Sequence, residues 1–209
     1  MTKAAAIAAL GFAPHSGWAA VVGLGGDEAH RRILIRERVE MTDPRDPGSK
    51  QPYHAVRGLP ISQAARRLAS YEATAELMAH EAIQRIAGRL SQSGHRVIGA
   101  GILESAGRKG SSLADTLASH ALVHAADGDH FRNAIAAAAT RCALTVSRVR
   151  ARDVESEAAA VADRGLETLR RALQTLGRDV GPPWGADQKS AALLAWIVLT
   201  KESSGGRQT

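Results

Sequence analysis

Three short apolar runs near the amino terminus, separated only by tight turns, limit the folds open to this chain more than any other feature. Residues 6–12 (AIAALGF) are apolar at every position, as in a strand buried on both faces in the middle of a sheet. Residues 18–24 form a second run, and residues 33–41 alternate between apolar and charged side chains, which is typical of a half-buried strand. The short turns predict two antiparallel hairpins, so the first and third strands run parallel.

The rest of the chain alternates between helical and strand patterns. The proline- and glycine-rich segment 42–60 is expected to exclude regular structure and to form a functional or mobile loop. After it we expect a long helix at 62–90 and a strand at 97–103. A helical stretch should follow from Ser112, with Asp115 as its capping partner, to 142, and it should break near Asp127 and Gly128. The remaining expected elements are a strand at 144–149, a helix at 154–176 and a buried helix at 186–199. This order predicts an α/β fold with a five-stranded mixed sheet of order 3-2-1-4-5 and helices on both faces. We expect one domain, residues 1–201, and a disordered tail, residues 202–209.

Composition narrows the class of protein. With 44% hydrophobic and 23% charged residues, the chain is typical of a soluble globular protein. Its net charge of +6 favours polyanionic partners such as nucleic acid. The single cysteine, Cys142, excludes an internal disulfide and a cysteine-based zinc site. No apolar run reaches the roughly 18 residues of a membrane span, and the first run lacks a signal-peptide cleavage pattern, so we expect a cytoplasmic, bacterial-type protein with no membrane contact.

Three short motifs, together with the strand order and the chain length, resemble the RNase H-like superfamily and most of all the RuvC-type Holliday junction resolvases. Residues 11–17 (GFAPHSG) are similar to the family's first-strand signature, Gly-hydrophobic-Asp-Pro-Gly-Ser. Glu104 ends the fourth strand where the family has a catalytic glutamate, and Asp187, followed by alanines, matches an aspartate at the start of the family's last helix. The resemblance implies an RNase H-like fold over nearly the whole chain and a nuclease centre that uses Mg²⁺ or Mn²⁺.

Two features depart from that pattern. The first-strand aspartate of the family is Ala13 here, and Lys189 and Ser190 occupy the neighbourhood of a second acidic residue near the last helix. Two-metal nucleases hold two ions about 3.5–4 Å apart, and a methyl group cannot ligate Mg²⁺, which requires oxygen ligands. We therefore expect a RuvC-like protein whose nuclease centre has degenerated. Glu104 and Asp187 would be its remnant catalytic carboxylates and would bind a metal ion weakly at most.

Both carboxylates also have simpler interpretations. Glu104 can pair with Arg108 or another arginine, or be exposed at the end of its strand. An aspartate at the start of a helix, such as Asp187, accepts backbone N–H bonds and favours the positive end of the helix dipole. Helix capping alone is therefore enough to explain why an aspartate occurs at position 187.

Basic residues from two segments are expected to meet at one end of the sheet. Arg45, Lys50 and Arg57 lie in the loop after the third strand, and Arg108 and Lys109 lie in the turn after the fourth. Because parallel strands end at the same edge, these cations would form a nucleic-acid-binding rim around the ancestral site. Scattered solvated charge is the alternative interpretation.

His120 and His124 lie four residues apart on an expected helix, which puts two imidazoles on one face, as a zinc pair requires. Asp127, Asp129 and His130 are close in sequence, but there is no HExxH motif and no third ligand of defined geometry. A solvated or internally satisfied histidine pair is the simpler interpretation, and the sequence leaves metal binding by this pair open.

Four functions remain. The leading one is a non-catalytic protein that binds DNA or another structured nucleic acid, or a protein partner. The second is an active, Holliday junction resolvase-like endonuclease that uses Glu104, Asp187 and a third ligand such as His15. A structural module that forms homodimers or other assemblies is the third. An actin-like ATPase is disfavoured, because such proteins need two copies of the fold to clamp ATP.

Overall fold

The five strands form one mixed sheet, seen in a computed structural model that describes residues 5–27, 30–105, 110 and 112–205. The strands are β1 (Ala6–His15), β2 (Trp18–Gly25), β3 (Arg32–Glu40), β4 (His95–Glu104) and β5 (Thr145–Arg150). Their order is β3-β2-β1-β4-β5, which confirms the expected 3-2-1-4-5 arrangement. β1 pairs antiparallel with β2 and parallel with β4, so the apolar first run is the central strand. The carboxyl ends of β1, β3, β4 and β5 therefore lie at one edge of the sheet.

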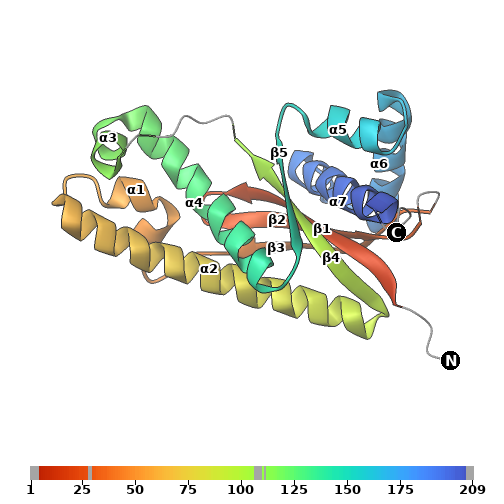
Figure 1. Cartoon of the computed structure of the whole chain (residues 1–209), viewed down its shortest axis with the longest axis horizontal. Coiled ribbons are helices and arrows are strands. Elements are labelled where there is room, and N and C mark those ends of the chain that lie inside the picture. The colour runs from red at the N-terminus through yellow and green to blue at the C-terminus, as the bar shows by residue number, and fades with distance from the viewer. Residues whose placement is uncertain (1–4, 28–29, 106–109, 111, 206–209) are drawn as a thin grey trace.

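Helices cover both faces of the sheet (Figure 1). On one face lie α5 (Val154–Val161), α6 (Leu166–Val180) and α7 (Ala186–Gly205). On the other face lie α2 (Ile61–Gln92) and α4 (His120–Arg141). The short helices η1 (Pro47–Lys50), α1 (Pro52–Ala55) and α3 (Leu113–Ala118) belong to the segments that follow β3 and β4. Figure 1 shows α1, α3 and the start of α4 grouped beyond one end of the sheet.

The close approach of α7 to the sheet depends on glycines. A Cβ atom at Gly11 of β1 would lie 1.8 Å from the carbonyl oxygen of Ala191, and one at Gly101 of β4 would lie 2.7 Å from that of Leu194. Farther back along β4, a Cβ at Gly99 would meet Val198 of α7. The helix thus runs antiparallel to the two central strands, and its first turn lies toward their carboxyl ends.

The loop expected at 42–60 contains two short helices, so the expectation that its prolines exclude regular structure is wrong. Pro47 and Pro52 occupy the first positions of η1 and α1. Proline fits there because its fixed φ is helical and its missing N–H would have no partner in the first turn.

Two expected helix boundaries are also wrong. α4 continues through Asp127 and Gly128, and the break comes earlier, at Ser119, whose hydroxyl accepts the N–H of Leu122. The single helix expected at 154–176 is divided into α5 and α6 around Asp163, which has a φ of 47°. The expected cap is confirmed, since the Ser112 hydroxyl accepts the N–H of Asp115 at 3.1 Å, and α7 runs on to Gly205, beyond the end expected for the last helix.

The edge strand β3 carries charged side chains toward both faces. Glu37 forms ion pairs with Arg85 and Arg89 of α2. Arg36 donates hydrogen bonds to the carbonyl oxygens of Gly181 and Pro183 on the other side. These contacts fix β3 between helix layers. Among the described residues, no helix is both long enough and apolar enough to cross a membrane.

Candidate functional site

Ala13 lies near the carboxyl end of β1 and is buried, with 1% of its surface exposed. Its side chain belongs to the apolar cluster beneath α7, together with Ala9 and Ala191. Because side chains alternate along a strand, Gly11, Ala13 and His15 share this face. Since α7 runs antiparallel to β1, its first turn, which carries Asp187, lies over the Ala13 end of the strand.

Asp187 forms an ion pair with His15, at 3.0 Å between a carboxylate oxygen and the imidazole Nε2. The His15 ring stacks on Trp18, with ring centroids 4.3 Å apart. The Arg38 guanidinium also lies over the Trp18 ring, 4.0 Å from its centroid. The stack holds the imidazole in place beside Asp187. Both partners of the ion pair are partly exposed, so the pair contributes little to stability, about 0–1 kcal/mol.

Glu104 forms its ion pair on the other side of the sheet. Its carboxylate accepts a hydrogen bond from Arg148 of β5 at 2.6 Å, and Arg148 also donates to the side-chain oxygen of Asn133 on α4. Ile102, two residues earlier, belongs to the α2–α4 cluster, so the alternation of β4 also puts Glu104 on the α4 side. Glu104 and Asp187 are therefore held in different ion pairs, and both pairs would have to open before the two carboxylates could share one ion.

The guanidinium of Arg132 also lies near Glu104, and the sequence does not predict this. Arg132 of α4 is half-buried, donates to the carbonyl oxygen of Leu103 at 3.0 Å and lies 3.6 Å from Asp129. Burial lowers the pKa of Arg132, while the charges of Asp129 and Glu104 raise it. The sequence shows the Asp129 partner three residues earlier on α4, but it does not show the contact with β4. Arg132 and Arg148 offset the charges of Asp129 and Glu104, so these four side chains carry no net negative charge that would attract a divalent cation.

The described part of the expected basic rim lies on one segment. Arg45, Lys50 and Arg57 follow β3, and all three are exposed. Arg45 pairs with Asp43 at 2.8 Å, and the hydrogen bonds between them lower the pKa of Asp43 and raise that of Arg45. Arg108 and Lys109 lie outside the described residues, so convergence of the two segments stays a prediction.

Solved structures of other proteins share this fold. No family model matches the chain, and no curated protein matches it. Solved structures do match it, among them Thermus thermophilus RuvC in complex with a Holliday junction substrate and Thermus thermophilus RuvC itself. Each is 14% identical to this chain, with a TM-score of 0.53 over 95% of this chain and 96% of the other.

The fold is RuvC-like. The match confirms the RNase H-like, RuvC-like architecture expected from the strand order and the three motifs. At this identity the match shows the fold alone.

Proposed function

We propose that this chain is a RuvC-like protein whose nuclease centre has degenerated and that it binds DNA or another structured nucleic acid. The observation that carries the proposal is Ala13, a buried methyl group at the position where the resemblance implies a first-strand carboxylate. A cytoplasmic location in a bacterial cell is part of the same proposal.

The loss of cleavage follows from the ligands that remain. Mg²⁺ and Mn²⁺ at a two-metal centre need several oxygen ligands, and one carboxylate normally bridges both ions. Here Glu104 is neutralised by Arg148, and Asp187 is paired with His15. Glu104 would have to give up its hydrogen bond from Arg148 to bind an ion, and His15 and Asp187 would have to exchange their mutual contact for contacts with the ion.

Nucleic-acid binding is supported by charge and by the structural neighbour. The chain carries a net charge of +6, and Arg45, Lys50 and Arg57 lie exposed on the segment after β3. The neighbouring Thermus thermophilus RuvC was solved with a Holliday junction. A branched duplex is therefore the substrate with which binding should first be measured.

The purified protein is expected to cleave neither Holliday junctions nor RNA–DNA hybrids in Mg²⁺ or Mn²⁺, because the bridging carboxylate is missing. Gel assays on labelled branched and duplex substrates measure this. Strong metal-dependent cleavage that disappears in Glu104→Gln would contradict the proposal.

Binding to branched DNA is expected to be weak and sensitive to salt. Each phosphate contact contributes about −0.9 to the slope of log K against log salt on duplex DNA. The double variant Lys50→Glu, Arg57→Glu should weaken binding and reduce that slope by about 2 if each residue makes one contact. Fluorescence anisotropy in chelator, at several salt concentrations, measures both quantities.

The control for this double variant is Arg171→Glu, Arg178→Glu. Both residues are exposed on α6, which packs on α5 and β3. This variant therefore changes the net charge by the same amount as the first, but on a different surface. An equal loss in the two double variants would mean that net charge alone drives binding. Undetectable binding of the wild type at about 50 mM salt would favour a protein partner or a second copy of the chain instead.

An active endonuclease is the second candidate, and the His15–Asp187 contact favours it. His15 Nε2 and the Asp187 carboxylate lie 3.0 Å apart on the face of Ala13, so both could ligate one divalent ion. This candidate predicts cleavage that is lost in both His15→Gln and Asp187→Asn.

A further inference from the structure

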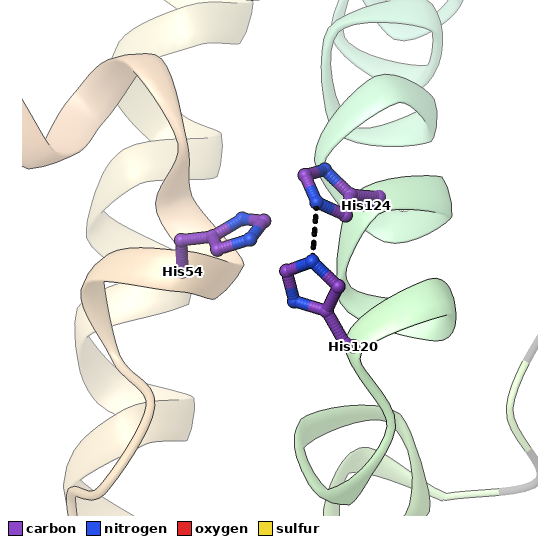
Figure 2. A group of neighbouring side chains, drawn as sticks. All are labelled: His54, His120 and His124. Atoms are coloured by element: carbon purple, nitrogen blue, oxygen red, sulfur yellow. Dashed lines mark hydrogen bonds between the residues drawn. The ribbon is translucent and has the colours of Figure 1, made fainter.

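Three histidine side chains from two separate segments meet beyond the carboxyl edge of the sheet. His54 comes from α1, and His120 and His124 come from the first two turns of α4. One ring nitrogen from each of the three lies within 4.8 Å of the other two. Figure 2 shows the His54 ring pointing across from α1 toward the two imidazoles on α4.

The two histidines of α4 already have nearly the spacing of ligands to one ion. Their Nε2 atoms lie 3.0 Å apart. Two imidazoles bound tetrahedrally to zinc at about 2.0–2.1 Å have their nitrogens roughly 3.4 Å apart. A shift of a few tenths of an ångström would therefore admit the ion between them, and no change of helix geometry is needed.

His54 is held in the tautomer that a metal ligand requires. Its Nδ1 lies 2.5 Å from Oδ2 of Asp127, so the Nδ1–H donates to this carboxylate and the lone pair of Nε2 is left free. Asp127 is buried, with 5% of its side chain exposed, and its other oxygen accepts the backbone N–H of Tyr53 at 2.7 Å. A carboxylate behind a ligating histidine orients the ring and raises its basicity.

The surroundings allow an ion to enter. His120 and His124 are exposed and His54 is half-buried, so the side of the cluster away from Asp127 is open to solvent. Arg57 is a nearby cation, and the buried carboxylate of Asp127 offsets its charge, so the cluster is close to neutral.

We propose that His54, His120 and His124 form a binding site for a divalent transition-metal ion, with zinc as the expected occupant and water as the fourth ligand. Three neutral nitrogens suit zinc and its first-row neighbours, whereas Mg²⁺ and Ca²⁺ prefer oxygen. The site is therefore distinct in chemistry and place from the carboxylates Glu104 and Asp187. The ion would tie the segment after β3 to the start of α4.

Calorimetry of the chelator-treated protein with Zn²⁺ tests the site. The wild type should bind one ion, and a hundredfold excess of zinc over Kd should raise Tm by about 5–10 °C. His120→Gln and His54→Gln, as separate variants, should each weaken zinc binding by about 100-fold or more because each removes a ligand. Loss of a residue that only hydrogen-bonds to a ligand already weakens metal binding by about 10–100-fold. Asp127→Asn, which keeps an oxygen for the Tyr53 N–H, should lose about 10–100-fold.

His30→Gln is the matched control, because His30 is an exposed histidine paired with an aspartate, Asp27, but stands outside the cluster. Its zinc affinity should equal that of the wild type. Co²⁺ provides a second readout, since a tetrahedral site gives intense visible absorption that His120→Gln and His124→Gln should abolish. No heat and no change in Tm with excess zinc, or the same loss in His30→Gln as in His120→Gln, would overturn the proposal.

Discussion

Gly11→Ala is expected to lower the free energy of unfolding by about 3 kcal/mol, at the upper end of the usual cost of overpacking a core. The added methyl group would lie 1.8 Å from the carbonyl oxygen of Ala191 and 2.9 Å from the backbone nitrogen of Ala195. Both obstacles are backbone atoms of α7, so no side-chain rotation can relieve the contact. The central strand and the buried helix would have to separate, which also opens the apolar cluster around Trp196.

Gly88→Ala is the control for this substitution. Gly88 lies within α2, and a Cβ atom there would meet nothing within 4 Å. Alanine should stabilise that helix by roughly 0.5–1 kcal/mol because it restricts the unfolded chain more than glycine does. Urea unfolding of both variants should therefore give shifts of opposite sign. Two shifts of the same sign and size would show that α7 does not approach β1 closely.

Ala13→Asp is expected to destabilise the protein in chelator by about 1–3 kcal/mol and to recover with Mn²⁺ or Mg²⁺. The new carboxylate would be buried under α7, on the face that carries Asp187 and His15, where burial and a like charge both oppose ionisation. A divalent ion would neutralise the two carboxylates and bind only the folded state. At one hundred times its Kd it would return about 2.7 kcal/mol.

Ala13→Asn separates metal binding from the burial of a polar group. The amide has nearly the same shape and should also destabilise the protein, but it carries no charge to attract a hard cation. Thermal melts of wild type and both variants, with chelator and with Mn²⁺, measure the difference. If Ala13→Asn gains as much from metal as Ala13→Asp, position 13 does not face Asp187, and the match to the family's first-strand motif loses its support.

The sheet could be predicted from the sequence because its signals are local. The continuous apolar run of β1 predicts a strand buried on both faces, and the alternation in β3 predicts a strand by its period of two, although the burial of β3 does not itself alternate. Short turns then leave one pairing for the first three strands. The same local signals found the long helix α2 and the cap at Ser112.

The site was less predictable because its contacts join distant residues. Asp127 suggested a helix break, since an aspartate beside a glycine usually favours a turn. In the fold it is buried within α4, where His54, 73 residues away, donates a hydrogen bond to its carboxylate. For the same reason the sequence predicts His120 and His124 as a pair without a third ligand. It also predicts an arginine partner as one interpretation of Glu104, but it does not single out Arg148.

The strand order leaves β3 as an edge, and its charged side chains have a consequence for self-association. An open edge is a template for another strand, from a second copy or from a misfolded chain. On β3, Arg36 and Glu37 are engaged with the helix layers on either side, and Arg38 and Glu40 add further charge along the strand. A neighbouring chain would have to displace or desolvate these groups before it could add to the sheet. These charges therefore disfavour edge-to-edge pairing at β3.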